Sequence, residues 1–354
     1  MSDTDSILGV SYEIPVDVEL TGLSVRSIVQ RHLHLSRRML RQLVASNSIR
    51  KNHEVAYLRS TAHVGDIIYV MLPREQTELE PEAVLLDVRY EDHEVLIVNK
   101  PAGMLTHPTA REREGSLLQA AYARVAPSVP HCVHRLDRET SGLVMLAKHG
   151  HFHHLFDEAL RKGHIHRVYC AFIHLEEDEG AFESEDWETI DLPIAQDPNA
   201  PSRRIISATG QRAVTHYRLL AAESGIGVAL VVLETGRTHQ IRLHFAAIGQ
   251  PLVGDPVYGT RISRSRNAPF HSPTRNTTGS ATNTLIRQAL HALGMWFLHP
   301  VTGEEHKVFA EIPEDMLDEW SRVGGSRETI NERLKTAFLE TGIFANIEGR
   351  GELT

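Results

Sequence analysis

The sequence predicts an α+β fold built on a mixed, largely antiparallel sheet. Short apolar segments typical of buried strands occur at 95–98, 169–173 and 228–233, and segments with helical spacing lie between some of them. These elements do not alternate in the regular strand, helix, strand order of a parallel α/β domain, so an α+β arrangement is favoured. At 354 residues, with 41% hydrophobic and 23% charged residues, the chain can form one large globular domain and a smaller one.

The smaller domain is predicted at 12–75. Apolar residues at helical spacing predict helices over 25–33 and 37–44, and Ser36 is well placed to cap the second helix. Two short strands should complete this domain, one beginning at Ile49 and one over 66–70.

A polar, acidic and proline-bearing linker is expected at 76–84, followed by a main domain over 85–315. Residues 261–284 are rich in Ser, Thr, Asn and Arg and lack apolar periodicity, which predicts a mobile surface loop inserted in the main domain. Residues 316–354 are a C-terminal extension, with helices expected between 315 and 344. The other elements expected in the main domain are the three strands named above, a helix over 152–162 that ends at Gly163, and a helix over about 238–248 that ends at Gly249.

Composition excludes several classes of protein. No apolar run approaches the roughly 20 residues of a membrane-spanning helix, and the first residues lack the basic-then-apolar order of a signal peptide, so we expect a cytoplasmic protein. Cys132 and Cys170 are the only cysteines, too few for a disulfide framework or a cysteine zinc site. Redox chemistry is not indicated.

Charge is distributed unevenly along the chain. The formal net charge is −9, yet residues 22–60 hold eight basic residues against one acid, and residues 260–287 hold five arginines and no acid. The compensating acids gather elsewhere, with nine of them at 176–191. A basic segment of this kind indicates either a polyanionic partner such as nucleic acid or a solvated face of the protein.

A first dense motif runs over 134–142 and precedes an apolar strand. It places the carboxylate of Asp137 between Arg135 and Arg138, in a turn. Functional groups are often carried on loops held by a rigid scaffold, so Asp137 is a candidate nucleophile or acid/base group. The alternative is an ordinary turn with a surface ion pair, which would contribute about 0–1 kcal/mol.

A second dense motif covers 233–259. A strand ends near Glu234, Gly236 permits a turn, and the predicted helix follows. His239 and Arg242 are three residues apart and should lie on one side of that helix. Taken alone, His239 and His244 fit surface or capping histidines as well as functional ones.

Three ordered segments, 99–108, 134–142 and 235–259, together resemble the RluA-type RNA pseudouridine synthases, over roughly residues 85–315. The resemblance implies the pseudouridine synthase fold and isomerisation of specific uridines in ribosomal or transfer RNA, with no metal and no cofactor. It identifies Asp137 as the catalytic aspartate and nucleophile, Tyr169 as an active-site tyrosine, and Arg242 as the basic residue expected to pair with Asp137. The substrate-binding residues that it implies are Arg135, His134, Thr140, Arg237, His239 and Gln240.

The N-terminal segment resembles an S4 RNA-binding domain, with Leu35, Ser36, Arg37 and Arg38 opening the second helix. The chain departs from the usual Val-Asn-Gly turn, since it has Arg-Lys-Asn-His-Glu over 50–54. The resemblance implies a small α+β domain that contacts RNA, in a protein expected to be a monomer. The RNA-binding residues expected here are Arg37, Arg38, Arg41, Arg50 and Lys51.

Three rival functions deserve comparison. A metal-dependent hydrolase is suggested by 22 histidines and by the run at 149–154, but no carboxylate–histidine motif accompanies that run. A glycosidase normally needs two facing carboxylates, whereas the motifs offer one dominant aspartate. A non-catalytic RNA-binding or ribosome-assembly protein could keep the fold, but it would have no need to retain Asp137, Tyr169 and Arg242.

Overall fold

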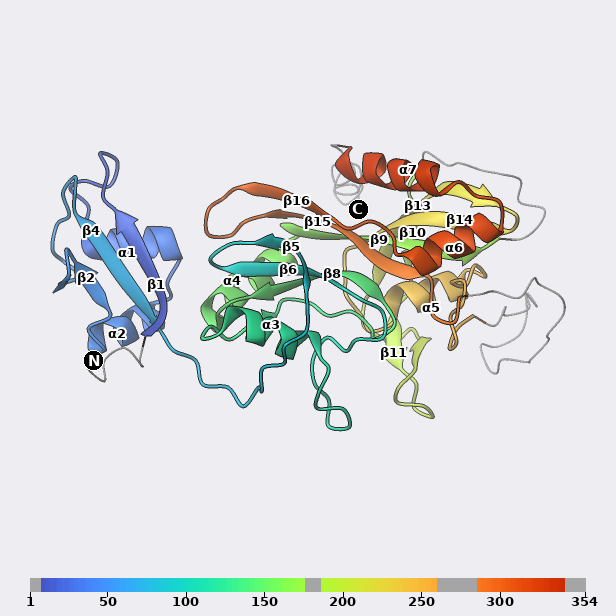
Figure 1. Cartoon of the computed structure of the whole chain (residues 1–354), viewed down its shortest axis with the longest axis horizontal. Helices are drawn as coiled ribbons and strands as arrows, with labels where there is room; N and C mark the ends of the chain where they lie inside the picture. Colours follow the sequence, from blue (N-terminus) through green and yellow to red (C-terminus); the bar gives the residue numbers. More distant parts are fainter. Residues whose placement is uncertain (1–7, 176–185, 260–284, 341–354) are drawn as a thin grey trace.

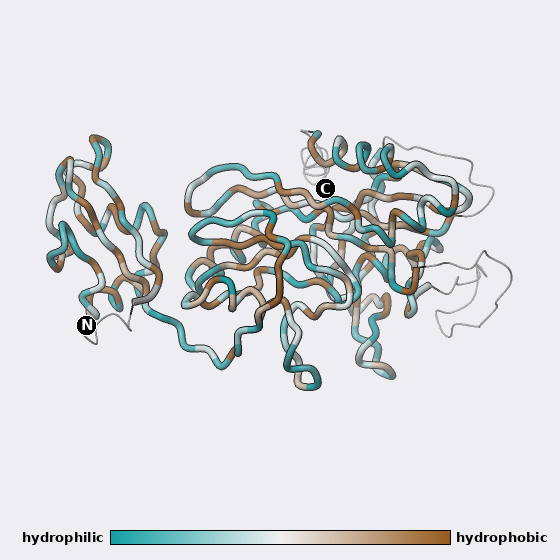
Figure 2. Tube along the Cα trace, in the orientation of Figure 1, coloured by the Kyte–Doolittle hydropathy of each residue, from teal (hydrophilic) through white to brown (hydrophobic). Residues whose placement is uncertain are grey.

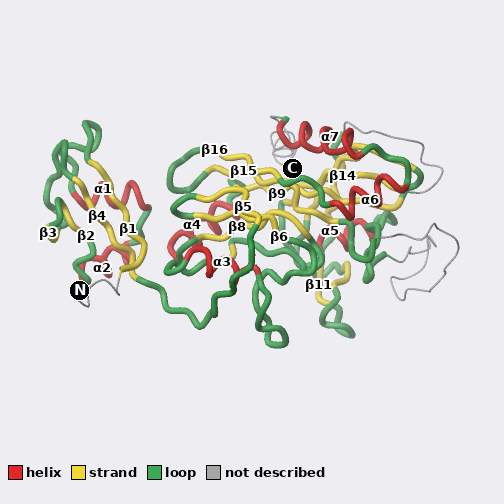
Figure 3. Tube along the Cα trace, viewed as in Figure 1, coloured by secondary structure: helices red, strands yellow, loops and turns green. Residues whose placement is uncertain are grey.

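The computed structural model describes residues 8–175, 186–259 and 285–340, which form an elongated molecule with two main sheets (Figure 1, Figure 3). The N-terminal module, residues 8–73, has a four-stranded sheet of order β1-β4-β2-β3 and two helices. The predicted loop at 261–284 lies outside the described residues. The elements of the module are β1 (Leu8–Pro15), α1 (Val25–Leu33), α2 (Arg37–Ala45), β2 (Ile49–Lys51), β3 (Glu54–Val55) and β4 (Ile67–Pro73).

The N-terminal module confirms both predicted helices. Ser36 caps α2, because the Met39 N–H donates to its hydroxyl oxygen at 3.1 Å. Leu43 of α2 and Ile68 of β4 are fully buried between the helices and the sheet. Strand β1 was not predicted; it adds to the sheet by antiparallel pairing with β4, a partner more than fifty residues later in the chain.

The large sheet is largely antiparallel, as predicted. Its main path has the order β10-β13-β14-β9-β15-β8-β6-β5, with β16 on β15 and β7 on β8. A separate two-stranded hairpin, β11 (Ile194–Gln196) with β12 (Arg204–Ile206), protrudes from the body (Figure 1). The strands of the large sheet are β5 (Asp87–Glu91), β6 (Val95–Lys100), β7 (His131–Cys132), β8 (Ser141–Ala147), β9 (Ile165–His174), β10 (Glu188–Asp191), β13 (Val214–Glu223), β14 (Ile226–Leu233), β15 (Leu290–Leu298) and β16 (Glu305–Phe309).

Helices cover both faces of this sheet, which explains its continuous apolar strands. Helices α3 and α5 pack on the face that carries Leu96, while α4 packs on the opposite face, which carries Val95. In Figure 2 brown segments are concentrated in the central strands of the large sheet, whereas the tips of the protruding loops are largely teal or white. The helices are α3 (Leu117–Val125), α4 (Gly150–Arg161), α5 (Gln240–Ala247), α6 (Glu314–Arg322) and α7 (Arg327–Leu339).

Two helices follow the sheet, in the segment where the sequence predicts them. Trp320 of α6 and Phe338 of α7 are buried in one apolar cluster with Phe172 of β9. The C-terminal helices therefore share the core of the large sheet. Helix α3 was not predicted, although Ser116 and Gln119 form the reciprocal capping pair that marks its start.

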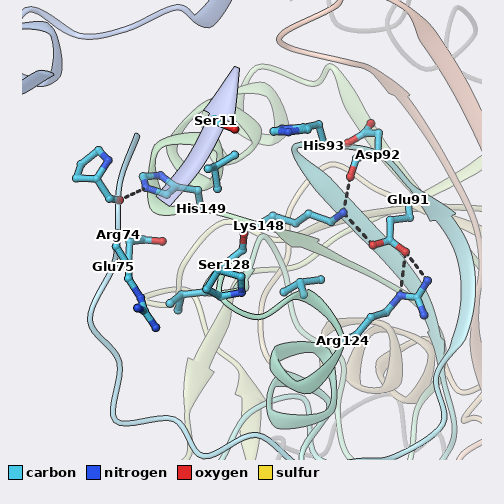
Figure 4. A pocket seen from close by; sticks show the side chains of 15 residues that line it. Ser11, Arg74, Glu75, Glu91, Asp92, His93, Arg124, Ser128, Lys148 and His149 are labelled. Carbon is cyan, nitrogen blue, oxygen red and sulfur yellow. Dashed lines mark hydrogen bonds and ion pairs between the residues drawn. The ribbon is translucent and has the colours of Figure 1, made fainter. Parts of the chain in front are cut away.

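The N-terminal module contacts the large domain along a seam at α4. The His151 ring nitrogen Nε2 lies 2.7 Å from the Leu33 carbonyl oxygen, and the rings of Tyr12 and Phe152 are 5.7 Å apart. A cavity of about 560 Å³ lies at this seam (Figure 4). Two of its cations are paired, since Lys148 and Arg124 both reach the Glu91 carboxylate, at 2.9 and 2.6 Å.

The connecting segment 74–86 has no helix or strand but is held at two points. The Glu75 carboxylate accepts hydrogen bonds from the Gly150 N–H at the start of α4, at 3.1 Å. The Glu82 carboxylate accepts from the Gly115 N–H at 2.7 Å, beside the start of α3. Within the described residues, no helix is long and apolar enough to cross a membrane.

The two halves of the large sheet join where β8 and β15 run parallel. Gly142 lies opposite Ala292 in this pairing and has φ +112°. A Cβ atom added to Gly142 would lie 2.3 Å from the Ala292 carbonyl oxygen and 2.4 Å from its nitrogen. Backbone atoms cannot yield as a flexible side chain can, so this position requires glycine.

Substituting Gly142→Ala should therefore destabilise the protein by roughly 2–5 kcal/mol, from overpacking and from the left-handed backbone together. Gly163→Ala is the matched control, because Gly163 also has positive φ but no heavy atom lies within 4 Å of the point that an alanine methyl would occupy. The free energy of unfolding of the control should fall by only about 1–2 kcal/mol. Urea denaturation measures both losses, and equal losses would contradict the steric argument.

Candidate active site

The turn that carries Asp137 is fixed by its own closure and by a threonine from another loop. The Thr140 N–H donates to the Asp137 carbonyl oxygen at 3.1 Å, just before β8 begins. The buried Thr106 hydroxyl donates to the Leu136 carbonyl at 2.9 Å and accepts from the Leu136 N–H at 3.3 Å. The backbone on the N-terminal side of Asp137 is thus held by two hydrogen bonds to one side chain.

Lys100 is a further anchor of this turn. Its ammonium group is fully buried and donates to the carbonyl oxygens of Pro101, Met104 and Arg138, at 2.9, 2.9 and 3.0 Å. Burial lowers the pKa of Lys100 to about 7, although the negative charges of Glu139 and Asp137 oppose the shift. The lysine at the end of β6 therefore ties the following loop to the residue next to Asp137.

Arg242 on α5 is the ion-pair partner of Asp137. Its Nη1 atom lies 3.2 Å from Asp137 Oδ2, whereas Arg138 instead pairs with Glu112, at 2.8 Å. The expected pairing across more than a hundred residues is confirmed. Asp137 remains partly exposed, at 22% of its side-chain surface, while Arg242 is 6% exposed.

Asp255 holds the other edge of Arg242. Its Oδ2 atom accepts from Arg242 Nε at 2.7 Å, and its Oδ1 atom accepts from Nη2 at 2.9 Å. Burial opposes the charge of Arg242, but hydrogen bonding to Asp255 and the charges of Asp255 and Asp137 outweigh it and raise the pKa of Arg242. Sequence reasoning assigned no role to Asp255, although it lies in the second motif.

His239 also approaches Asp137. It stands in the left-handed region, with φ 59°, at the residue before α5, and its Nε2 atom is 3.7 Å from Asp137 Oδ2. Its Nδ1 atom lies 3.0 Å from the Tyr258 hydroxyl, which itself accepts from the Arg204 N–H at 2.9 Å. With the hydroxyl donating to Nδ1, the neutral ring would carry its proton on Nε2, the nitrogen that faces Asp137. Burial lowers the pKa of His239, against the charge of Asp137.

Tyr169 on β9 completes the pocket around Asp137. Its side chain is 4% exposed, and burial raises the pKa of its hydroxyl, with Arg167 opposing and Asp137 adding to the shift. Tyr169 is therefore a neutral phenol near neutral pH. The three predicted catalytic residues, Asp137, Tyr169 and Arg242, line one pocket.

Comparisons with known proteins identify the family of this chain. Residues 94–247 match the family model of RNA pseudouridylate synthase. The chain is 34% identical over 315 residues to an uncharacterized RNA pseudouridine synthase, YhcT, of Bacillus subtilis, covering 87% of this chain and 96% of that protein. The chain belongs to the RluA-type RNA pseudouridine synthases.

Two further similarities concern a named enzyme and a solved structure. The synthase is 36% identical over 286 residues to the ribosomal large subunit pseudouridine synthase D of Xanthomonas campestris, covering 79% of this chain and 82% of that one. A solved structure, human RNA pseudouridylate synthase domain containing 4, is 21% identical with a TM-score of 0.49, covering 67% and 92% of the two chains. The predicted enzyme class, an isomerase of uridine in RNA, is confirmed by the family.

Five of the six predicted substrate-binding residues of the synthase line the same pocket. Among them, Gln240 has no free hydrogen-bonding group: its oxygen accepts from Thr235 and the Arg237 N–H, and its nitrogen donates to Val214 and Thr215. Gln240 thus holds the turn that presents Arg237. The five are Arg135, Thr140, Arg237, His239 and Gln240.

His134, the sixth predicted substrate-binding residue, does not line the pocket. It is buried, and its Nε2 atom accepts from the Met145 N–H of β8 at 3.2 Å. Burial lowers the pKa of His134 to about 3, so the ring is neutral. Its contacts support the strand behind the turn, a placement that the motif alone does not reveal.

The histidine run of α4 is bonded to backbone groups of the synthase. Ring nitrogens of His149, His151 and His153 lie 3.0, 2.7 and 3.1 Å from the carbonyl oxygens of Pro73, Leu33 and Cys132, respectively. These contacts account for the run by the packing of α4 against its neighbours. They give the metal-hydrolase alternative no converging set of ligands at this helix.

Asp92, Glu94 and His299 form a group whose side-chain ligand atoms lie within 4.8 Å of one another. His299 Nδ1 accepts from the N–H groups of Val301 and Thr302, at 3.2 and 3.1 Å. The ring proton must then be on Nε2, which faces the Asp92 carboxylate at 3.3 Å. A histidine that ligates a metal normally donates its other ring N–H to a protein acceptor, whereas Nδ1 of His299 accepts, so this tautomer does not favour a metal site.

The predicted RNA-binding residues lie on two surfaces of the N-terminal module. Arg37, Arg38 and Arg41 are exposed on α2. Arg50 and Lys51 are on β2, where Lys51 pairs with Asp66 at 3.2 Å. Most of this basic charge therefore faces solvent.

The buried ammonium group of Lys100 predicts a pH-dependent stability. The pKa of Lys100 is about 7 in the folded protein, against 10.5 for an ordinary lysine. Between these two pH values the unfolded chain therefore binds more protons than the folded protein. Stability then rises with pH over that window in the wild type, and Lys100→Met lacks this gain. The stability difference, wild type minus variant, should rise by on the order of 1 kcal/mol per pH unit above pH 7.

Urea denaturation of both proteins between about pH 6 and pH 9 measures this difference. Lys162→Met, which replaces a lysine at the exposed end of α4, is the control for the loss of a lysine as such. A difference for Lys100→Met that stays constant with pH would contradict the proton-binding argument.

Proposed function

We propose that this synthase isomerises uridine in ribosomal RNA, with Asp137 as the catalytic nucleophile. The observation that carries the proposal is the ion pair between Asp137 and Arg242 in a pocket that also contains Tyr169. Asp137 is the only carboxylate among the described residues that line this pocket, which disfavours a two-carboxylate glycosidase. The ribosomal target is supported by the name of the Xanthomonas relative.

The reaction can proceed with one carboxylate because it is an isomerisation. The bond between N1 of uracil and C1′ of the ribose breaks, the uracil rotates, and C5 joins C1′ while C5 loses its proton and N1 gains one. Asp137 would either form a transient bond to the substrate or stabilise the sugar cation electrostatically. Arg242 would orient the carboxylate and keep it ionised in a partly buried site.

Tyr169 is proposed to contact the uracil. Since its hydroxyl remains protonated, the ring can stack on the base and the hydroxyl can donate a hydrogen bond to it. Abstraction of the C5 proton would need the phenolate form, which burial disfavours. Binding and orientation of the base are therefore the roles that its environment supports.

Cations at the pocket are proposed to hold the displaced nucleotide. A stacked uridine must first leave its helix or loop, at a cost of a few kcal/mol. Arg135 and Arg237 are exposed at the pocket and suit phosphate oxygens, while His239 and Thr140 offer hydrogen-bonding groups closer to Asp137. Their contacts with RNA would offset the cost of unstacking.

The N-terminal module is proposed to be an S4-like RNA-binding domain. Helix α2, which carries its exposed arginines, lies toward the lower edge of the molecule in Figure 1, as does the β11–β12 hairpin of the large domain. We propose that the catalytic domain begins near residue 85 and includes α6 and α7, because these helices share its core. A cytoplasmic monomer that needs neither metal nor cofactor remains our expectation.

Asp137→Asn should reduce release of labelled C5 hydrogen from uridine in RNA by roughly a thousandfold or more, because the amide cannot act as an anionic nucleophile. RNA binding should persist. Glu139→Gln is the control: this carboxylate is two residues away and 44% exposed, and release should stay near the wild-type rate. Equal release by wild type and Asp137→Asn would refute the catalytic assignment.

Replacing Arg37, Arg38 and Arg41 together by Gln should weaken binding to ribosomal RNA fragments and reduce the slope of log affinity against log salt by about 2 to 3. The helix should remain folded, because these side chains are exposed. The control replaces Arg161 and Lys162, exposed on α4, by Gln. An unchanged slope in the α2 variant would show that this surface is only solvated.

A further inference from the structure

We infer that Asp255 is a positioning residue for catalysis, which holds Arg242 so that Asp137 keeps one oxygen free of hydrogen bonds. The inference rests on the proposed role of Asp137 as the catalytic carboxylate. It adds a residue that touches neither Asp137 nor the pocket surface.

Arg242 is shared unequally between two carboxylates. Asp255 takes two of its donors, Nε and Nη2, at 2.7 and 2.9 Å, in the two-point geometry that arginine and carboxylate prefer. Asp137 accepts a hydrogen bond only from Nη1, at 3.2 Å. The fork with Asp255 fixes the plane of the guanidinium and thereby limits what Asp137 can accept from it.

Asp255 is itself held without freedom to rotate. Its carboxylate is fully buried, and Oδ1 also accepts the N–H groups of Val257 and Tyr258, at 2.8 and 3.0 Å. Burial disfavours its charge, but Arg242 and the two N–H groups outweigh burial and lower the pKa of Asp255. An ionised, immobile carboxylate is a suitable fixed point for an arginine.

The same segment places a second side chain near the same oxygen. Tyr258 packs its ring 5.3 Å from the Arg242 guanidinium carbon and bonds His239 Nδ1, which turns His239 Nε2 toward Asp137 Oδ2. Both Arg242 and His239 therefore approach Oδ2. No hydrogen bond to Asp137 Oδ1 is found among the described residues, so Oδ1 is the oxygen available to the substrate.

Without Asp255, Arg242 would have one remaining carboxylate partner. Its guanidinium could then rotate to bind both oxygens of Asp137, which would lower the reactivity of that carboxylate and misplace it. A group displaced by about 1 Å can cost on the order of 100-fold in rate. The effect would fall on the chemical step, because Asp255 does not reach the pocket surface.

Asp255→Asn tests this inference with little change in shape. The amide oxygen can keep the N–H groups of Val257 and Tyr258, but the amide nitrogen would face the Nε–H of Arg242, donor against donor. The single-turnover rate of C5 hydrogen release at saturating RNA should fall by about 100-fold, with RNA affinity nearly unchanged. Asp315→Asn is the matched control, because Asp315 forms the same two-point pair with Arg287 at 2.6 and 2.7 Å, and it should keep the wild-type rate.

A double-mutant cycle separates positioning from general destabilisation. If Asp255 acts through Arg242, then Asp255→Asn should cost no further rate in an Arg242→Met background. Thermal unfolding of each variant fixes the folded fraction used to calculate the rate. A wild-type rate for Asp255→Asn, or rate losses that multiply in the double variant, would overturn the inference.

Two further variants keep the outcomes distinct. If Asp255→Asn does not fold, Asp255→Glu keeps the charge but moves the carboxylate by one methylene; a loss of rate with unchanged RNA affinity supports positioning, and a wild-type rate refutes it. Asp137→Ala tests the proposed function separately. An active Asp137→Ala protein would refute the catalytic role of Asp137, whereas an inactive one beside a fully active Asp255→Asn would refute only the role of Asp255.

Discussion

The close approach of β8 and β15 at Gly142 is the constraint on which the rest of the structure depends. In the described part of the large sheet this is the parallel pairing, and it joins the half that contains β5 and β6 to the half that contains β9 and β14. Asp137 lies five residues before Gly142, and Tyr169 lies on β9, the other neighbour of β15. The backbone contact at Gly142 therefore sets the spacing between the turn that carries Asp137 and the strand that carries Tyr169.

Buried charges then fix the site that this joint creates. Lys100 satisfies three carbonyl groups of the loop and turn, and Arg242 satisfies two carboxylates from separate segments. Removing Arg242 would leave the buried Asp255 carboxylate without its counter-charge, which is strongly destabilising. These contacts restrict the turn, which is what the proposed role of Asp137 requires.

Sequence reasoning succeeded where a signal is local or lies in a dense motif. Helical spacing and the Ser36 cap predicted α1 and α2, and the family resemblance identified Asp137, Tyr169 and Arg242, which line one pocket. The sequence did not predict elements and residue roles that depend on partners far away in the chain. Strand β1 is defined by pairing with β4, and motif membership could not distinguish His134, which supports β8, from residues that line the pocket. The role of Asp255 required knowing which edge of Arg242 it occupies.

The attachment of the N-terminal module bears on which RNA the synthase can select. The connecting segment is not a free tether, since Glu75 is bonded at α4 and Glu82 beside α3, and His151 bonds the module directly. The basic face of α2 therefore stands at a set displacement from Asp137. An RNA that engages both must present a phosphate-rich segment and the target uridine at that spacing, which a folded RNA can do and a flexible strand does only at an entropic cost. If the module binds RNA as proposed, these contacts favour a structured target over an isolated sequence.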